Sequence, residues 1–193
     1  MQLRCMVRSS IVVVYTAAPC VSADVDHMTW RTTMGSELSN SAARVQAVLT
    51  AAGYTFEVTE LPDSTRTAKE AAASIGCSVA QIAKSLVFKN DAGDPVLVVA
   101  SGVNRVDTAK VAAATGTALH KADADFVKAR VGFAIGGIPP VGHSTALPTY
   151  LDRDLQQHEV IWAAAGSPFA VFRLTPTELG TLTGGRWLEL RSG

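Results

Sequence analysis

Lys84 is the first residue of the sequence whose type and place could do chemistry. It stands where a short amphipathic segment, ending at Ala83, gives way to an apolar run from Ser85 to Phe88. A lysine so placed keeps its stem near the core while its ammonium needs a polar partner, so it could hold a phosphate or a developing oxyanion. The same place is more often that of a surface lysine whose stem lies on apolar residues. Position alone therefore assigns it no role.

The segment Gly136-Gly137-Ile138-Pro139-Pro140-Val141-Gly142 is the second such feature. Adjacent glycines permit positive φ and bring backbone N–H groups close to a ligand, while the two prolines stiffen the return of the chain. Such a loop could form an oxyanion hole from main-chain donors alone. A tight turn between two strands would also explain the glycines, although it would leave the double proline incidental.

Two further side chains follow this loop, and no familiar catalytic motif accompanies them. His143 could carry a proton near neutral pH, and Asp152 could orient a ligand or cap a turn. The sequence contains no G-x-S-x-G elbow, no H-E-x-x-H helix and no Walker loop. The remaining histidines, His27, His120 and His158, are scattered, and none has a metal-ligand partner at a suitable spacing. We therefore expect neither a metal nor another cofactor.

The hydrophobic pattern predicts the elements that must position these residues. Helical spacing and capping residues predict helices over 41–53 (with Ser41 as N-cap), 67–76, 78–83, 107–116, 123–130 and 177–182. Alternating or continuous apolar runs predict strands over 54–58, 84–89, 95–100, 159–164, 169–174 and 186–190. The turn-rich segment 90–94 has the length of a hairpin connection. This order favours a mixed α/β fold in which helices surround a largely antiparallel sheet.

Length and composition indicate one folded domain, which we place at residues 34–193. The chain has 193 residues, of which 48% are hydrophobic, and this is enough for one substantial core. Basic and acidic residues both number 17, so any contact with nucleic acid must be local. Between Lys84 and Arg130, seven basic residues against five Asp leave a small positive surplus. The three widely spaced cysteines indicate neither a disulfide framework nor a zinc site, which fits a reducing, cytoplasmic location.

Residues 1–33 form an N-terminal extension. Arg4 and Arg8 precede the apolar run 11–18, and small residues follow at 21–23, which is the layout of a secretory signal. The apolar run is too short to span a bilayer as a helix. Met34 begins a polar segment that leads into a regular amphipathic pattern. We therefore favour a mis-assigned upstream start or a disordered extension over a true signal.

Three segments in this order resemble the YbaK/EbsC family of aminoacyl-tRNA deacylases, which also occurs as the insertion domain of bacterial prolyl-tRNA synthetases. The segments are the lysine-bearing strand start 82–86, the glycine-proline loop 136–142, and Leu147-Pro148-Thr149 leading to Asp152. The similarity covers about residues 41–191 and implies the fold of that editing domain.

The resemblance implies a domain that binds the 3′ end of mischarged tRNA and hydrolyses the aminoacyl ester without a metal or a protein nucleophile. Lys84 would hold the terminal phosphate or the reactive end, and the amides of Gly136 and Gly137 would bind the carbonyl as it becomes an oxyanion. The candidate substrate-binding residues are Pro139, Pro140, Gly142, His143 and Asp152. Partners would be aminoacyl-tRNA and an aminoacyl-tRNA synthetase, with no membrane.

The sequence does not decide which amino acid is the substrate. Several family members have a polar Ser-Gly-Gly near the pocket where this chain has Ala164-Ala165-Gly166, which removes one hydroxyl. Pocket volume separates side chains that differ by a methylene or a hydroxyl poorly, so Cys, Ala, Ser and Thr are not ranked, although cysteine on tRNA(Pro) is one candidate. Two other classes fit the same residues: a non-catalytic module that binds tRNA ends or a synthetase, and a small-molecule esterase or thioesterase.

Overall fold

The computed structural model describes residues 38–63 and 65–192, so the predictions about residues 1–33 lie outside the described part. The helices in this part are α1 (Asn40–Ala51), α2 (Ala68–Ile75), α3 (Thr108–Thr115), α4 (Ala124–Val131) and α5 (Pro176–Thr183), with 3-10 turns η1 (Val79–Gln81) and η2 (Arg153–Gln157). The strands are β1 (Val58–Glu60), β2 (Ile82–Lys89), β3 (Pro95–Ser101), β4 (His120–Lys121), β5 (Thr149–Asp152), β6 (Ile161–Ala164), β7 (Ala170–Leu174) and β8 (Arg186–Leu188).

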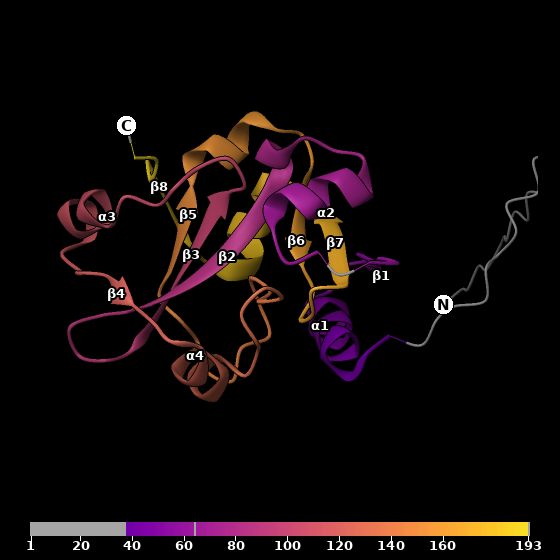
Figure 1. The fold of residues 1–193 in the computed structure, drawn as a ribbon, viewed down its shortest axis with the longest axis horizontal. Coiled ribbons are helices and arrows are strands. Elements are labelled where there is room, and N and C mark those ends of the chain that lie inside the picture. Colours follow the sequence, from indigo (N-terminus) through magenta and orange to yellow (C-terminus); the bar gives the residue numbers. More distant parts are fainter. Residues whose placement is uncertain (1–37, 64, 193) are drawn as a thin grey trace, which may run out of the picture. The chain divides into compact units, whose positions relative to one another are not determined.

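The strands form one mixed sheet in the order β1-β7-β6-β2-β3-β5-β8, with β4 added beside β2 (Figure 1). The pairings of β1 with β7, β2 with β3, β2 with β4, and β6 with β7 are antiparallel. Those of β2 with β6, β3 with β5, and β5 with β8 are parallel. The predicted mixed α/β fold is confirmed, and the hairpin of β2 and β3 forms its centre.

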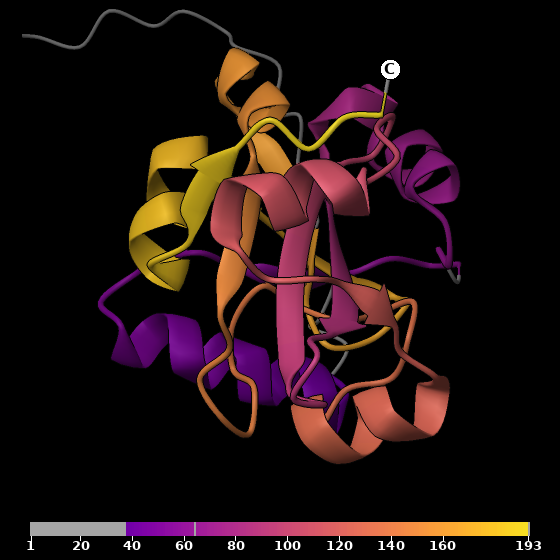
Figure 2. The same ribbon diagram turned by 90° about the vertical axis from the view of Figure 1, so that its left-hand side faces the viewer.

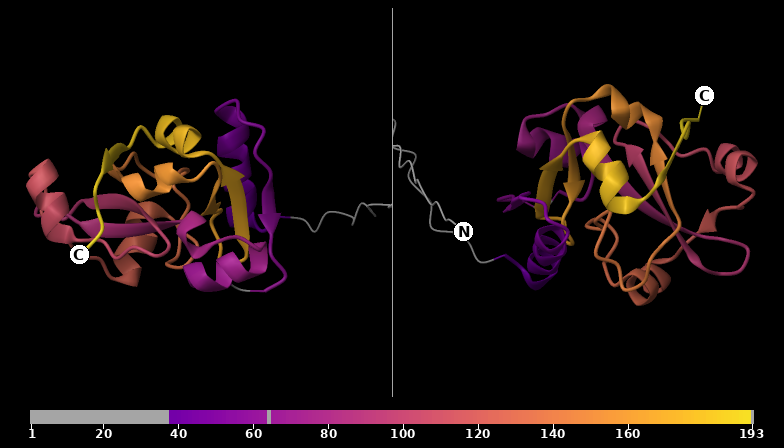
Figure 3. Two further views of the ribbon diagram at one scale, coloured as in Figure 1. Left: turned by 90° about the horizontal axis from the view of Figure 1, so that it is seen from above. Right: turned by 180° about the vertical axis from the view of Figure 1, so that it is seen from behind.

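Helices cover both faces of the sheet. Figures 2 and 3 show α1 and α5 on the side of the sheet opposite to α2. Strand alternation explains this arrangement, because successive β3 side chains point to opposite faces. Leu97 joins the main core with Val45 of α1 and Leu179 of α5. Val98 joins a second cluster with Val111 of α3.

The structure moves several of the predicted boundaries, among them those of the first helix, the first strand and the segment 78–83. Helix α1 begins at Asn40 with Ser39, not Ser41, at the N-cap, and the Ser39 amide donates to Glu60. The predicted strand 54–58 forms only from Val58 onward. The side-chain amide of Gln46 takes the place of a partner strand there, since its Oε1 accepts from the Val58 amide and its Nε2 donates to the Phe56 carbonyl, both at 2.8 Å.

The predicted helix 78–83 ends early for a different reason. Only Val79–Gln81 is helical, while Ile82 and Ala83 begin β2 because they pair in parallel with β6. A partner some eighty residues away in the chain therefore overrides the local helical pattern. By contrast, the predicted caps at Thr67, Asp107 and Asp123 all accept amide hydrogen bonds from the first turns of their helices.

Candidate active site

A stretch of β2 without a partner strand on one edge defines the candidate site. On that edge β2 pairs with β6 only at Ile82 and Ala83, and with β4 only at Phe88 and Lys89. Within the described residues, positions 84–87 therefore have a strand neighbour only on the β3 side. A cavity of about 460 Å³ opens along this edge. Its walls come from β2, from the β6–β7 hairpin, from the loop around Gly136 and from the start of α2.

Lys84 lies in the wall of this cavity, half-buried, and its ammonium is already partly satisfied. Its Nζ donates to the carbonyl of Gly102 at 3.2 Å and to the carbonyl of Asn104. Burial lowers the pKa of Lys84 from its ordinary value of 10.5, while the nearby Asp152 carboxylate opposes that shift. An ammonium carries three hydrogens, so two protein acceptors leave one for a ligand.

The glycine loop contributes its first two glycines in different ways. Gly136 lines the cavity with φ of 98°, and its amide makes no hydrogen bond within the described residues. The Gly137 amide donates to the Ala134 carbonyl at 3.2 Å, so it holds the loop together. Gly137 also lies so close to the backbone of Ser167 that a Cβ there would approach it to 2.5 Å. The structure therefore leaves the amide of Gly136, and not that of Gly137, without a partner.

The other loop residues predicted to bind substrate lie outside the cavity wall. Pro139 and Pro140 are buried, and Gly142 accepts a hydrogen bond from Arg44 of α1 through its carbonyl. His143 Nε2 donates to the carbonyl of Pro139 at 2.8 Å, since a carbonyl can only accept. These four residues fix the return of the loop, and any effect they have on substrate would act through its shape.

Asp152, the last predicted site residue, is almost fully buried and also stands apart from the cavity wall. Its Oδ2 accepts from the Ser101 amide at 3.0 Å and from the side-chain amide of Asn104 at 2.8 Å. Its Oδ1 caps η2 by accepting from the Asp154 amide at 3.1 Å. Asp152 therefore acts as a cap and as an anchor for the segment whose carbonyls hold Lys84.

Burial gives His143 a testable effect on stability. Desolvation lowers the pKa of His143 below 6.5, the hydrogen bond to Pro139 opposes this, and Arg44 adds to it. A lowered folded-state pKa means that the unfolded chain binds the proton more readily. The contribution of His143 to stability is thus fully present above about pH 6.5 and is lost as the pH falls toward the lowered pKa.

We expect His143→Gln to flatten this part of the curve of stability against pH, measured as urea midpoints from pH 5 to 8. Identical slopes in both proteins would contradict this.

Sequence reasoning missed much of the cavity wall, including two cations. Arg66 and Lys69, at the start of α2, line the cavity together with Lys84, and no Asp or Glu lines it. Among the described residues, neither side chain makes an ion pair. The capping box at Thr67 was the available signal, because it places the start of a helix just before Lys69. The electrostatic character of this cavity is therefore positive, although the chain as a whole is neutral.

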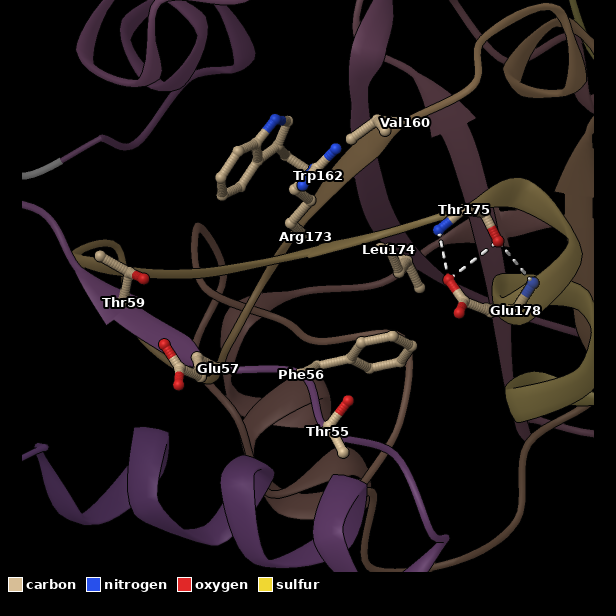
Figure 4. Close-up of a pocket in the computed structure, with 10 residues that line it drawn as sticks. All are labelled: Thr55, Phe56, Glu57, Thr59, Val160, Trp162, Arg173, Leu174, Thr175 and Glu178. Atoms are coloured by element: carbon tan, nitrogen blue, oxygen red, sulfur yellow. Dashed lines mark hydrogen bonds between the residues drawn. The ribbon is translucent and has the colours of Figure 1, made fainter. Parts of the chain in front are cut away.

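A second cavity of about 510 Å³ lies near β1 and the start of α5 (Figure 4). It contains none of the predicted site residues. Glu57, Arg173 and Glu178 line it, and the Glu178 carboxylate is occupied by the amide and hydroxyl of Thr175. Although this cavity is slightly larger, we place the candidate active site in the first one, because only that cavity brings Lys84 and Gly136 together.

Residues 38–63 and 65–192 contain neither a cluster of metal ligands nor a membrane-spanning helix. No three His, Cys, Asp or Glu side chains in this part are placed to hold a metal ion. None of its helices has the length and apolar character needed to cross a membrane.

The fold and the cavity define a class of protein: a mixed α/β domain with a cationic, partly apolar cavity at a gap in its sheet. Comparison with known proteins identifies that class. Residues 62–182 match the model of the aminoacyl-tRNA editing domain. The chain belongs to this family, and the resemblance to YbaK/EbsC proteins is confirmed.

Individual relatives agree with this assignment. The chain is 32% identical over 135 residues to the uncharacterized protein YwhH of Bacillus subtilis (strain 168), covering 69% of this chain and 86% of the relative. It is 32% identical over 127 residues to a protein of Enterococcus faecalis named "Putative Cys-tRNA(Pro)/Cys-tRNA(Cys) deacylase EbsC", covering 64% and 76%.

A solved structure extends the agreement to the fold. A crystal structure described as "a putative trans-editing enzyme for prolyl tRNA synthetase" is 50% identical, with a TM-score of 0.77 over 81% of this chain and 99% of that one.

Proposed function

We propose that this protein is a free-standing deacylase that hydrolyses the ester of mischarged aminoacyl-tRNA. The observation that carries the proposal is the cavity in which Lys84, Arg66 and Lys69 stand without any carboxylate beside the unpaired amide of Gly136. Three cations suit the phosphates of an RNA end, and a main-chain donor suits a developing oxyanion. The family membership and the names of the relatives support the same reaction.

The reaction we propose needs no protein nucleophile. The oxygen of a water molecule adds to the ester carbonyl carbon, and the carbonyl electron pair moves onto the carbonyl oxygen, where the Gly136 amide stabilises it. Breaking the bond to the ribose oxygen then releases the amino acid, and that ribose oxygen takes up the proton that the water has lost. Lys84 would hold the terminal phosphate or the reactive end with its remaining hydrogen. If a side-chain thiol of the substrate attacks in place of water, the amino acid leaves as a cyclic thioester and the thiol proton passes to the ribose oxygen. A neighbouring ribose hydroxyl would act on the attacking water, because its own attack would only transfer the acyl group between ribose oxygens.

Part of the cavity wall is apolar and suits an uncharged amino acid side chain. Ala164 from the segment that departs from the family pattern lies in its wall, together with the apolar side chains of Leu86, Ile138 and Val171. We therefore propose a small residue wrongly attached to tRNA(Pro), with cysteine as one candidate that the name of the EbsC relative supports. The proposed site of action is the cytoplasm, where a synthetase could be a partner.

The test is a panel of correctly and wrongly charged tRNAs, incubated with the purified full chain and scored for release of the amino acid. We expect release from at least one tRNA that carries a small wrong amino acid, and no release from correctly charged prolyl-tRNA. Binding of tRNA without any release would indicate a non-catalytic module. Hydrolysis of small esters or thioesters that is unaffected by tRNA would indicate an esterase or thioesterase.

The two cations on α2 make a separate prediction about salt. Replacing Arg66 and Lys69 together by glutamine removes two possible phosphate contacts, and each contact contributes roughly 0.7 to the slope of log affinity against log salt on single strands. We expect the slope of log kcat/KM to fall by about 1.4 in magnitude. In the matched control, glutamine replaces Lys128 and Arg186, which are exposed and line neither cavity. An equal effect of both double variants would contradict a local contact.

A further inference from the structure

Ser85 has a polar atom that the fold leaves without a partner. Its Oγ is buried and makes no hydrogen bond, and among the described residues it is the only buried side-chain N or O atom in that condition. Leaving a buried hydroxyl unpaired is unfavourable, so native structures rarely keep one without a reason. The other three hydroxyl side chains in the cavity wall each have a partner: Thr65 donates to the Pro168 carbonyl, Thr67 accepts from the Glu70 amide, and Ser167 accepts from the Phe169 amide.

The strand geometry places Ser85 on the loop side of the cavity. Successive residues of β2 point to opposite faces, so Ser85 shares its face with Ala83 and Val87, and Lys84 points to the other face. Ala83 and Val87 belong to the same core cluster as Ile138 of the glycine loop. Ser85 and Gly136 both contribute to the wall of the cavity. The Ser85 hydroxyl therefore lies on the face of β2 against which the glycine loop packs.

The proposed reaction so far has only one hydrogen-bond donor for the developing oxyanion, the Gly136 amide. A developing oxyanion is usually met by two donors, and the Gly137 amide is engaged with the Ala134 carbonyl. We infer that the Ser85 hydroxyl is the second oxyanion donor, acting beside the Gly136 amide on the ester carbonyl of the bound aminoacyl group. It donates its proton in a hydrogen bond and forms no covalent bond, so it is not the nucleophile. This inference rests on the proposed deacylase function.

The test compares Ser85→Ala with the wild-type full chain on the tRNA that the wild type deacylates best. Losing one oxyanion donor costs about 10²–10³-fold in kcat. We expect that loss in single-turnover kcat, with KM changed by less than about threefold, because the donor acts on the transition state. Ser85→Thr keeps the hydroxyl and should restore most of the rate. Urea unfolding of Ser85→Ala should show a midpoint no lower than that of the wild type, since the variant removes an unpaired group.

Each result decides the matter. A Ser85→Ala rate within about threefold of the wild type would overturn the donor role, as would a lost rate that accompanies a lowered unfolding midpoint or that Ser85→Thr fails to restore. A wild-type chain that deacylates no member of the tRNA panel would overturn the proposed function, and the role of Ser85 with it. An active wild type with an unaffected Ser85→Ala variant leaves the deacylase standing and removes only the donor.

Discussion

Replacing Lys84 by alanine is expected to reduce kcat/KM for aminoacyl-tRNA by about 10²-fold or more while the protein stays folded. The charged group is the only lysine on β2 that lines the cavity, and it keeps one hydrogen for a ligand after bonding to two carbonyls. Charge-assisted hydrogen bonds contribute roughly 1.5–3 kcal/mol each, and more of this is realised when negative charge develops. Single-turnover deacylation, followed with circular dichroism of the same sample, measures both parts of the expectation.

Lys89 provides the control for this experiment. It lies on the same strand, but it pairs with Asp123 at 2.8 Å and does not line the cavity. Lys89→Ala should therefore keep nearly full activity. Full activity in Lys84→Ala would remove the role that we assign to the lysine, whereas equal losses in both variants would indicate a general effect of charge.

Gly137→Ala is expected to abolish activity and to lower the stability of the fold. A Cβ at this position would lie 2.5 to 2.8 Å from three backbone atoms of Ser167, so two loops would have to separate. Backbone atoms cannot rotate away as the end of a side chain can, and overpacking of this kind costs about 1–3 kcal/mol. The movement would also displace Gly136, the neighbour that carries the unpaired amide. Urea midpoints and deacylation rates should both fall.

Gly180 of α5 is the matched control for this substitution. The three atoms nearest to a Cβ there belong to the Trp187 side chain, the closest being Nε1 at 3.1 Å, and the residue lines neither cavity. Gly180→Ala also gains helix propensity. It should therefore leave activity intact. Wild-type activity in Gly137→Ala would show that the close approach of the two loops does not position the site.

Local signals in the sequence predicted the elements well where those signals were strong. The capping box at Thr67 and the hairpin around 90–94 rest on short-range hydrogen bonds, and both formed as expected. The parallel pairing of Ile82 with Trp162 rests on contacts between distant segments, which no local pattern encodes. The same limit explains why η1 ended before Ile82.

The candidate site shows the same division. Lys84 and Gly136 were predicted separately, and the fold brings them to one cavity. The family resemblance predicted Pro139 and His143 as substrate-binding residues; in the structure His143 donates to the Pro139 carbonyl and lies near Arg44 of α1. The unpaired hydroxyl of Ser85 could not be foreseen, since burial without a partner is a property of the packed structure.

The length of the gap in the sheet along β2 is set by how far the neighbouring strands β6 and β4 extend. Positions 84–87 stay open because β6 pairs with β2 at two residues and β4 at two others. Each further residue pair would shorten the opening by about 3.3 Å, roughly the width of a small side chain. Extending or trimming a strand would therefore change the length of the opening in steps, while the register between β2 and β3 and the position of Lys84 remain unchanged.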